Sequence, residues 1–340
     1  MSEPNRSDAD PVRRVLLLAH TGREDARDVA RAFCKALTAH GIVVRLIEQE
    51  AADLELDPAL FEPGIETVPT SRPEDRALTA ADCELAVVIG GDGTILRAAE
   101  LTHGTGTPLL GVNLGHVGFL AEAEYDDVES TISAIVERRY TSEERLTIDV
   151  QVFQGKKLVS DTFALNEVSV EKAARERMLE VVVEIDGRPL SRWGCDGVVC
   201  ATPTGSTAYN FSAGGPVVWP GVEALLIVPI SAHALFARPM VVAPTSVLAV
   251  EVLESTNGAG VMWADGRRTV ELPPGARIEV RRGTTPVRLV RLHDSPFTDR
   301  LVAKFGLPVQ GWRGASERRR RDADESAQDL ADGVDRGPHA

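Results

Sequence analysis

The sequence is poor in aromatic residues and cysteine, and it contains no long apolar run. Aromatic residues make up 5% of its 340 residues. No uninterrupted apolar stretch approaches the roughly 20 residues that a membrane-spanning helix needs. The few cysteines form neither a CxxC pair nor a zinc-type spacing, which argues against a cysteine metal site. Their apolar surroundings instead predict buried thiols in a reducing compartment. The four are Cys34, Cys83, Cys195 and Cys200.

From residues 1–10 we expect no secretory signal, and the chain lacks a positive net charge. Residues 1–10 are polar and acidic, without a basic region followed by an apolar stretch, so we expect a cytoplasmic protein. The formal net charge is −14, and a field of that sign repels phosphate backbones and anionic lipids. We expect neither a nucleic-acid partner nor a membrane partner. A small phosphorylated ligand would need a local basic patch or oriented backbone N–H groups.

Short apolar runs alternate with amphipathic stretches through residues 13–142, a pattern typical of strands and crossover helices in a parallel sheet. The expected strands are residues 15–19, 42–47, 85–89 and 109–112, and the expected helices are residues 26–39, 94–101 and 128–136. Hydrophobic residues make up 43% of the chain, enough for a substantial core. The sequence therefore predicts an α/β N-terminal domain with a Rossmann-like parallel sheet.

The hydrophobic period changes to two after about residue 146. Leu146, Ile148 and Val150 alternate with polar residues, and residues 179–185 repeat the pattern. Further strands are expected at residues 225–230, 247–253 and 287–292, with turns at the Asp-Gly pairs 186–187 and 265–266. Residues 143–293 are therefore predicted to form a β-rich C-terminal domain, a β-sandwich.

Several segments fall outside these regular patterns. Residues 51–79 are rich in Pro, Asp and Glu and have weak periodicity, which predicts a long loop or a small excursion over the first domain, able to act as a lid. Residues 1–12 and 313–340 have too few large apolar residues to offset the entropy of ordering, so we expect them to be disordered. Residues 294–312 are expected to return to the first domain.

The expected strand at residues 85–89 leads into the loop GGDGT, residues 90–94, and then into a helical pattern. Glycines at the carboxyl end of a strand let backbone N–H groups approach a phosphate, and the following helix directs its positive end toward the anion. Asp92 would then lie beside the phosphates. A plain hairpin turn is the alternative, since Asp-Gly is common in hairpins, but a hairpin leads into a strand. Neither the P-loop motif nor the three-glycine Rossmann fingerprint is present.

A second polar block, TPTGSTAYNFSAGGP at residues 202–216, offers small hydroxyls, backbone amides and an aromatic ring. This chemistry suits a ribose, a carboxamide or a stacked adenine, and a flexible loop is the alternative. The block does not fit the G-x-S-x-G nucleophile elbow. Upstream, Asn166 and Glu167 stand between apolar Leu165 and Val168, where a solvated edge turn is the simpler interpretation.

Taken together, these motifs resemble those of the NAD kinase family. The GGDGT loop is similar to an element that NAD kinases share with diacylglycerol and sphingosine kinases and with phosphofructokinases. The block at residues 202–216 resembles the most specific NAD kinase motif. The pair Asn166 and Glu167, the stretch NLGHVGFL at residues 113–120 and the pair at residues 196–197 also occur in family order. The resemblance spans roughly residues 85–270.

The resemblance implies roles for individual residues. Asp92 and Gly93 match the catalytic loop, with Gly91 and Thr94 beside them. Asn166 and Glu167 match the dinucleotide-binding pair. The stretch that encloses adenine and ribose in the family corresponds to Thr207, Ala208, Tyr209, Asn210, Phe211 and Ser212.

Four further positions follow from the same resemblance. Asp196 matches the acidic residue that contacts the nicotinamide end in the family, often from a neighbouring subunit. Arg97 and Arg177 stand where the family has a basic ligand-binding side chain, although an arginine on a helix face is more often solvated. Ser231 matches a small residue that lines the ligand.

Two positions depart from the family pattern. Many bacterial members have Asp-Gly-Gln where this chain has Asp265-Gly266-Arg267, which puts a binding role for Arg267 in doubt. Gly194 stands where some members have an arginine, which could alter contacts at the nicotinamide end.

The family implies a kinase that transfers the terminal phosphoryl group of ATP or polyphosphate to the 2′-hydroxyl of NAD's adenosine ribose. Asp92 would accept the hydroxyl proton, and Mg²⁺ would accompany the donor phosphates; no residue is predicted as a dedicated metal ligand. The family also implies a homodimer or homotetramer. A diacylglycerol-type lipid kinase is one alternative, although its GTxND-like segment is missing and residues 202–209 have no counterpart there. A dinucleotide-binding regulator without catalysis is the other.

Overall fold

The computed structural model describes residues 12–56, 64–69, 79–115, 118–123, 127–174, 178–256, 258–293 and 296–309. The two terminal segments expected to be disordered lie outside these residues, apart from residue 12. The chain divides into a large unit that ends at Asp294 and a small second unit. The second unit contains α7 (Phe297–Phe305), which ends at Gly306 with φ 58°, a common helix end. The expected return of residues 294–312 to the first domain stays a prediction.

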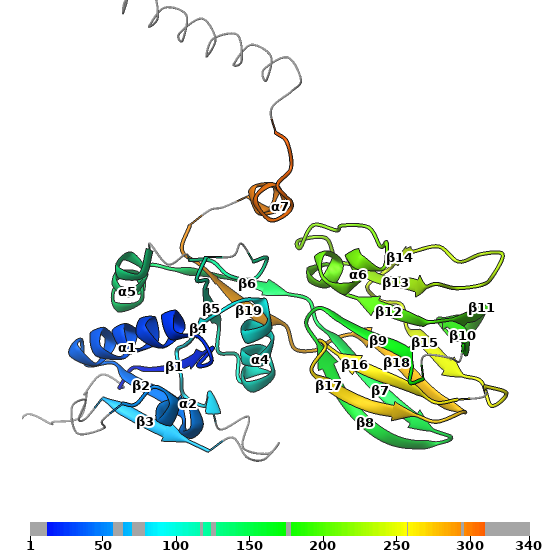
Figure 1. Cartoon of the computed structure of the whole chain (residues 1–340), viewed down its shortest axis with the longest axis horizontal. Coiled ribbons are helices and arrows are strands. Elements are labelled where there is room, and N and C mark those ends of the chain that lie inside the picture. Colours follow the sequence, from blue (N-terminus) through cyan, green and yellow to red (C-terminus); the bar gives the residue numbers. More distant parts are fainter. Residues whose placement is uncertain are drawn as a thin grey trace, which may run out of the picture. The chain divides into compact units, whose positions relative to one another are not determined.

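A seven-stranded sheet forms the N-terminal domain (Figure 1). Its spatial order is β3-β2-β1-β4-β5-β19-β6, and every pairing is parallel except that of β6 with β19. All five residues of β4 are buried, as expected for a central strand of a parallel sheet that is covered on both faces. The strands are β1 (Arg14–Ala19), β2 (Val43–Ile47), β3 (Ile65–Val68), β4 (Leu85–Ile89), β5 (Leu109–Val112), β6 (Thr141–Arg145) and β19 (Val287–Arg291).

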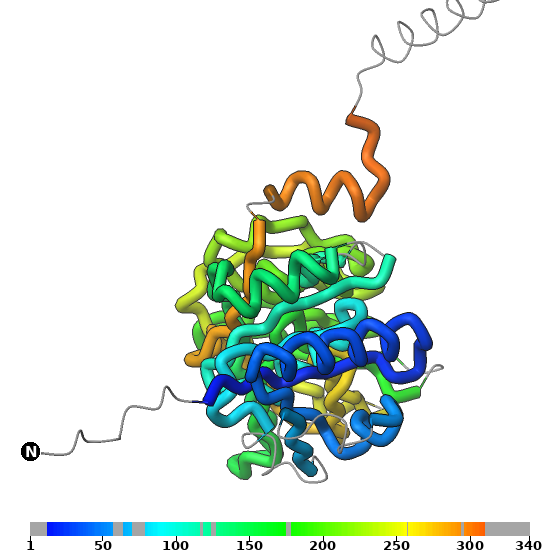
Figure 2. Tube along the Cα trace, turned by 90° about the vertical axis from the view of Figure 1, so that its left-hand side faces the viewer, coloured from blue at the N-terminus to red at the C-terminus, as the bar shows by residue number. Residues whose placement is uncertain are grey.

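Helices cover both faces of this sheet. On one face, α1 (Glu24–Ala39) and α5 (Val128–Val136) lie side by side (Figure 2). Val29, Phe33 and Leu37 of α1 form a buried stripe at helical spacing. On the other face, α4 (Asp92–Thr102) buries Ile95 and Ala99 in a separate cluster. The short α2 (Glu48–Asp53) follows directly on β2.

Two features of this domain correct the sequence analysis. Residues 51–79 are not a continuous loop, because β3 adds to β2 as a parallel edge strand and α2 extends to Asp53. The strand expected at residues 287–292 belongs to the first sheet: β19 pairs with β5 and β6. β6 itself extends past the boundary at residues 142–143. A strand's apolar pattern shows that one face is buried, but it does not identify the sheet to which the strand belongs.

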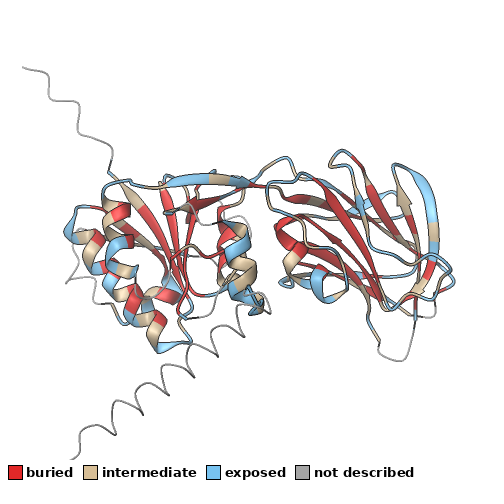
Figure 3. Cartoon of the chain, turned by 90° about the horizontal axis from the view of Figure 1, so that it is seen from above, coloured by how far each residue is buried: buried red, intermediate tan, exposed pale blue. Residues whose placement is uncertain are grey.

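The C-terminal domain is a β-sandwich of two six-stranded sheets, as the sequence predicts. One sheet has the order β11-β10-β15-β18-β7-β8 and the other β14-β13-β12-β9-β16-β17. Side chains from both sheets, such as Val150 and Val170, form one buried cluster between them, and Figure 3 shows the buried strands in each domain.

The strands of the first sheet of the sandwich are β7 (Ile148–Gln154), β8 (Lys157–Ala164), β10 (Leu179–Ile185), β11 (Arg188–Cys195), β15 (Leu248–Val252) and β18 (Ala276–Arg282). Those of the second are β9 (Glu167–Lys172), β12 (Gly197–Ala201), β13 (Leu225–Ile230), β14 (Met240–Val242), β16 (Gly260–Ala264) and β17 (Arg268–Leu272). Both expected Asp-Gly turns join antiparallel neighbours, and all four residues have positive φ, the geometry that favours this dipeptide.

Apolar and aromatic contacts join the two domains near α4. Leu165 precedes β9 but packs, fully buried, in the cluster of Ile95 and Leu120 of the first domain. His103, just after α4, stacks on Phe163 of β8 at 3.6 Å between ring centroids, and the Arg268 guanidinium lies 4.5 Å from the same ring. These contacts fix where the second domain meets α4. None of the helices that the structure describes is long and apolar enough to cross a membrane.

Candidate active site

The glycine loop connects the carboxyl end of β4 to the start of α4. Gly90 has φ 149°, and a Cβ there would lie 2.6 Å from Thr94 Oγ1, so glycine is required. Gly91 is the N-cap residue, and its carbonyl accepts hydrogen bonds from the N–H groups of Thr94 and Ile95. The helix therefore begins at Asp92, two residues earlier than the sequence predicts. The first N–H groups of α4 have no hydrogen-bond partner within the helix. They are available to a ligand, and an anion suits such donors.

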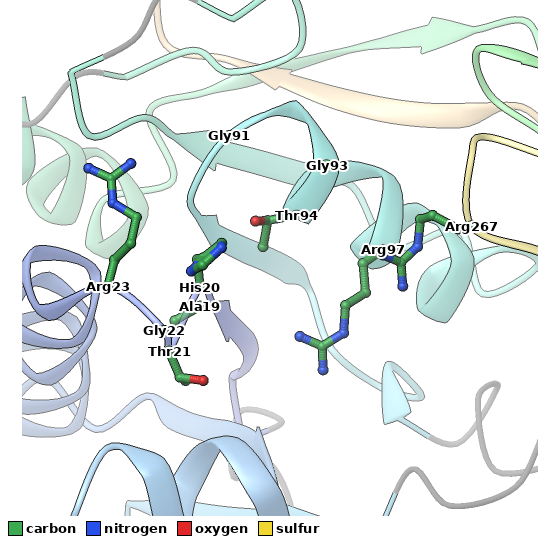
Figure 4. Close-up of a pocket in the computed structure, with 10 residues that line it drawn as sticks. All are labelled: Ala19, His20, Thr21, Gly22, Arg23, Gly91, Gly93, Thr94, Arg97 and Arg267. Atoms are coloured by element: carbon green, nitrogen blue, oxygen red, sulfur yellow. The ribbon is translucent and has the colours of Figure 1, made fainter.

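A pocket of about 580 Å³ opens beside this loop (Figure 4). It lies at the carboxyl ends of β1 and β4, where ligands of open parallel sheets bind. Its lining combines backbone and cationic side chains, and it includes Arg267 of the C-terminal domain, whose binding role the sequence left in doubt. The lining residues are Ala19, His20, Thr21, Gly22, Arg23, Gly91, Gly93, Thr94, Arg97 and Arg267.

The Asp92 carboxylate faces a second loop rather than joining the pocket lining. Phe119 and Leu120 donate their backbone N–H groups to its two oxygens, both at 3.2 Å. A Cβ at Gly118 would lie 2.5 Å from Asp92 Oδ1, so glycine leaves the room that this carboxylate occupies. The NLGHVGFL stretch thereby holds the proposed catalytic group, although its residues 116–117 lie outside the described part of the chain.

Arg97 is paired with a buried carboxylate that the sequence analysis did not identify. Its Nη1 contacts Glu50 Oε1, and Glu50 is 3% exposed. The backbone N–H of Ala19, a lining residue, donates to the other Glu50 oxygen at 3.0 Å. Burial raises the pKa of the Glu50 carboxyl, and the Arg97 charge opposes that rise. Glu50 thus holds Arg97 at the pocket through the ion pair and fixes the end of β1 through the hydrogen bond from Ala19.

Asn166 and Glu167 sit over a buried aspartate. Asp265 is 6% exposed and accepts the backbone N–H groups of Leu165, Asn166 and Glu167 at 3.0, 2.7 and 3.4 Å. Arg268 Nη2 pairs with it at 2.9 Å. Burial raises the pKa of Asp265, and these partners oppose the rise. The sequence had marked Asp265 as a turn residue and as the start of the Asp265-Gly266-Arg267 segment, and neither observation signals that its carboxylate supports the Asn-Glu pair.

The Glu167 carboxyl is buried and has a strongly shifted pKa. Burial, followed by the charge of Asp265, raises that pKa to about 8, and a hydrogen bond from the Tyr209 backbone opposes the rise. Its Oε2 atom has no hydrogen-bond partner among the described residues. A protonated carboxyl with an unpaired oxygen can donate a hydrogen bond to a ligand hydroxyl.

Residues 202–207, the TPTGST block, pack against the backbone of Leu165 and Asn166. The Thr202 hydroxyl donates to the Leu165 carbonyl at 2.6 Å and accepts the Gly205 N–H at 3.0 Å. A Cβ at Gly205 would lie 2.0 Å from the Asn166 carbonyl oxygen. The block forms a 3₁₀ turn, Thr204–Thr207, and then α6 (Tyr209–Ser212). It is therefore an ordered structure and not a flexible loop.

The predicted residues of this block have different environments. Thr207 and Ala208 are partly buried, and Tyr209 is exposed. Asn210 is fully buried, and its amide donates to the carbonyls of Ser206 and Pro216, both at 3.2 Å. This side chain shapes the block instead of facing solvent, because its donors already serve the backbone. Two others, Phe211 and Ser212, are exposed.

Asp196 and Ser231 lie together at the start of β12 and the end of β13. Lys172 Nζ lies 2.5 Å from Asp196 Oδ1, and its hydrogen bond, with a further one from Ser231, lowers the pKa of Asp196. Ser231 has φ 49°, a conformation that few non-glycine residues adopt. Tyr209 is hydrogen-bonded to Glu171, and burial followed by the Glu171 charge raises the pKa of its phenol.

The predicted site residues thus fall into two groups. Gly91, Gly93, Thr94 and Arg97 line the pocket. In the second group, the Asn166 carbonyl accepts a hydrogen bond from the Thr202 N–H, and the Tyr209 backbone donates to the Glu167 carboxyl. Arg177 lies outside the described residues. Thr21 and Arg23 of the pocket were missed, because the sequence assigned residues after 19 only to the connection leading into a helix.

A dedicated metal cage is not formed by the part of the chain that the structure describes. No group of three or more His, Cys, Asp and Glu side chains there could hold a metal ion. Mg²⁺ does not need such a cage, since it is commonly held by one or two carboxylates together with substrate phosphates and water. Asp92, on the loop that borders the cationic pocket, fits that arrangement.

Both domains match models of known families. A model described as the ATP-NAD kinase N-terminal domain matches residues 15–140, and one described as the ATP-NAD kinase C-terminal domain matches residues 165–292. The NAD kinase of Thermobifida fusca (strain YX) is 60% identical over 311 residues, which cover 90% of this chain and 93% of that protein. NAD kinase 2 of Streptomyces coelicolor is 60% identical over 305 residues, covering 89% and 98%.

Two solved structures share the fold. A yeast NADH kinase complexed with NADH aligns with a TM-score of 0.78 and 24% identity, covering 89% of this chain and 90% of that one. An NAD kinase from Archaeoglobus fulgidus in complex with ATP aligns with a TM-score of 0.62 and 24% identity, covering 86% and 98%. At this identity the two structures support the architecture, a sheet with helices followed by a β-rich region.

Proposed function

We propose that this chain, which belongs to the NAD kinase family, transfers the terminal phosphoryl group of ATP to the 2′-hydroxyl of NAD's adenosine ribose, giving NADP. The observation that carries the proposal is the pairing of two sites. A cationic pocket lies at the α4 amino terminus, and an ordered Asn-Glu and Ser/Thr-rich surface is seated against the same helix region through Leu165. Asp92 stands on the loop that borders the pocket.

The glycine loop binds the donor phosphates in this proposal. The first N–H groups of α4 and the guanidinium of Arg97 offer donors to phosphate oxygens, and the helix dipole favours negative charge there. The ATP complex of the Archaeoglobus relative is consistent with ATP as donor. Polyphosphate, which offers the same phosphate chemistry, is proposed as a second donor.

Asp92 orients the attacking hydroxyl and accepts its proton. The two N–H bonds from Phe119 and Leu120 hold its carboxylate in one orientation, and each oxygen keeps a further lone pair for the ribose hydroxyl. A carboxylate is a weak base toward an alcohol, so the proton moves late, after bond formation to phosphorus has made the hydroxyl more acidic. Much of the contribution of Asp92 is therefore positioning.

Mg²⁺ bound to the donor phosphates would neutralise charge that develops during transfer. Asp92 is the carboxylate that the glycine loop offers to such an ion, and the remaining donors would be phosphate oxygens and water.

The dinucleotide is proposed to bind along Asn166, Glu167 and the segment of residues 207–212, which contains Tyr209. Asn166 offers amide donors and an acceptor, and protonated Glu167 offers an O–H donor, which together suit the hydroxyls of a ribose. Tyr209 presents an exposed ring for stacking on a base. The NADH complex of the yeast relative is consistent with a dinucleotide ligand.

We also propose a cytoplasmic homodimer or homotetramer. All four cysteines are free, buried thiols, as is usual for a reducing compartment. Large apolar side chains close to Ser231 are exposed, with Leu235 at 111% and Phe236 at 51%, and exposed apolar groups of this kind favour a protein interface.

The proposal is tested with Asp92→Asn, which keeps the size of the side chain and one oxygen acceptor. The variant should fold and bind NAD, and its kcat should fall at least about a hundredfold, the usual loss when a general base is removed. NADP formed from MgATP and NAD is measured with an NADP-specific dehydrogenase.

Asp161→Asn is the matched control, because Asp161 is an exposed residue of β8 that contacts Gln151. It should keep wild-type turnover. Near-normal kcat in Asp92→Asn would refute the assignment of Asp92. No NADP from the wild-type protein with ATP or polyphosphate would leave the dinucleotide-binding regulator as the better interpretation.

A further inference from the structure

We propose that Arg267, supplied by the turn between β16 and β17, is a ligand for the phosphates of the donor, so that both domains build the donor site. The inference rests on the proposed function, because it takes the pocket at the α4 amino terminus as the donor site. Arg267 is the residue of the C-terminal domain that lines this pocket, together with Gly91, Gly93 and Arg97 of the first domain. Figure 4 shows its side chain beside α4, on the same side as Arg97.

The backbone that carries Arg267 is held firmly in place. Asp265 and Gly266 have φ of 52° and 63°, and the Arg267 N–H donates to the Ala264 carbonyl at 3.0 Å. The buried Asp265 carboxylate binds the backbone before Glu167. Arg267 therefore projects from a rigid turn, which reduces the entropy lost when its side chain binds an anion.

The two neighbouring arginines of this turn have different surroundings. Arg268 is 16% exposed, pairs with Asp265 and lies over Phe163, so its guanidinium is part of the joint between the domains. The Arg267 side chain is 36% exposed and donates through Nε to Glu100 Oε2 at 3.4 Å. Among the described residues its two terminal amino groups make no hydrogen bond, and a guanidinium binds phosphate oxygens in a bidentate fork.

Of the three arginines that line the pocket, Arg267 has the longest ion pair, so its guanidinium can move to a bound phosphate most readily. Arg97 pairs closely with Glu50, which is 3% exposed and cannot move away. Arg23 pairs with its neighbour Asp25 at 2.5 Å. The contact of Arg267 with Glu100 is the longest of these three ion pairs, and a hydrogen bond of that length is weak. A phosphate at the α4 amino terminus offers Arg267 a stronger partner at little cost.

The test is a comparison of kinetic constants in Arg267→Gln and Arg267→Lys. Arg267→Gln should raise the KM for MgATP about tenfold or more, the loss of one good charge-assisted contact, and leave the KM for NAD within about twofold. Arg267→Lys should fall between it and the wild type, since it keeps the charge and loses the fork. Binding of MgATP in the absence of NAD, measured by calorimetry, should weaken in parallel.

Two further variants separate ligand binding from a purely structural role. Glu100→Gln removes the ion pair but keeps Arg267, so the KM for MgATP should not rise. If the contact with Glu100 were what mattered, this variant would reproduce the defect of Arg267→Gln. Arg282→Gln, which removes an exposed pair with Glu223 in the same domain, should leave both KM values unchanged.

An unchanged KM for MgATP in Arg267→Gln, or a rise confined to the KM for NAD, would overturn the inference. Either result would be obtained with a wild-type enzyme that makes NADP, so it would leave the proposed function intact. Absence of NADP formation by the wild type would instead refute the function itself.

Discussion

Burial and the Asp265 charge raise the pKa of Glu167 to about 8 from an ordinary value of 4.5, so we expect its carboxyl to carry a proton at neutral pH in the unliganded protein. Between these two pH values the folded state binds more protons than the unfolded state. The free energy of unfolding therefore falls as pH rises through this window, by at most about 1.4 kcal/mol per pH unit. The contribution is fully present below pH 4.5 and lost above pH 8.

Glu167→Gln should remove this pH dependence, since the amide does not titrate. We expect the variant to lose less stability than the wild type between pH 6 and pH 8.5, measured by urea unfolding without nucleotide. Glu144→Gln, on the exposed strand β6, is the control and should keep the wild-type profile. If Glu167→Gln also followed the wild-type profile, the buried carboxyl would have to be ionised at neutral pH.

Single residues also show where a motif is informative and where it is not. Asp92 and Glu167 were recognisable in the sequence because each lies in a motif. The roles of Glu50 and Asp265 were not recognisable, since each acts on groups distant in the chain: Glu50 on Ala19 and Arg97, and Asp265 on the backbone before Glu167. A side chain whose partner lies far away in sequence leaves no local pattern.

At the scale of elements, the TPTGST turn depends on a close approach between two backbones. A Cβ at Gly205 would lie 2.0 Å from the Asn166 oxygen and 2.4 Å from its carbonyl carbon. Backbone atoms cannot yield as the end of a side chain can. The turn and the Asn166 segment therefore form one structural element, although 39 positions separate Gly205 from Asn166 in the sequence.

Gly205→Ala should lower the free energy of unfolding by about 3 kcal/mol or more, at the upper end of the range for overpacking, and raise the KM for NAD. Gly221→Ala is the matched control, since a Cβ there meets nothing within 4 Å, and its change should stay within about 0.5 kcal/mol. Urea unfolding and NADP assays measure both effects. Equal stabilities of the two variants would contradict the close packing.

The predicted α/β and β-sandwich architecture is confirmed, and its helices and hairpins follow from local patterns. The stripe of Val29, Phe33 and Leu37 has the helical period, and the Asp-Gly pairs adopt the positive φ that their turns need. The sheet neighbours of β3 and β19 were not predictable in the same way. β3 and β19 are short, and which neighbour completes each strand depends on pairing across the chain.

At the scale of the whole molecule, Leu165 couples the two domains. It is fully buried in the first domain's cluster with Ile95 and Leu120, although it begins the Asn166 segment of the sandwich. Its burial links the stability of the joint to the position of Asn166 and Glu167, the pair proposed to bind the dinucleotide. The joint is completed by the stacked pair His103 and Phe163.

Leu165→Ala should cost about 2–5 kcal/mol of unfolding free energy, as large-to-small changes in a core do, and should lower turnover by loosening Asn166. Leu158→Ala, at a position 45% exposed, is the control and should cost less than about 1 kcal/mol. Urea unfolding followed by fluorescence measures both. A loss in Leu165→Ala no larger than in the control would show that the two domains are held together elsewhere.

Three properties could be predicted from the amino-acid sequence: the NAD kinase family, the strand-loop-helix setting of Asp92 and the change from an α/β domain to a β-sandwich. Short motifs and hydrophobic periods encode these properties, because local conformation depends mainly on neighbouring residues. The folded chain was needed to show that β19 joins the first sheet, that Leu165 packs against the first domain, and that Arg267 lines the pocket of Arg97. Those outcomes depend on which distant surfaces pack together, and packing is a property of the whole fold.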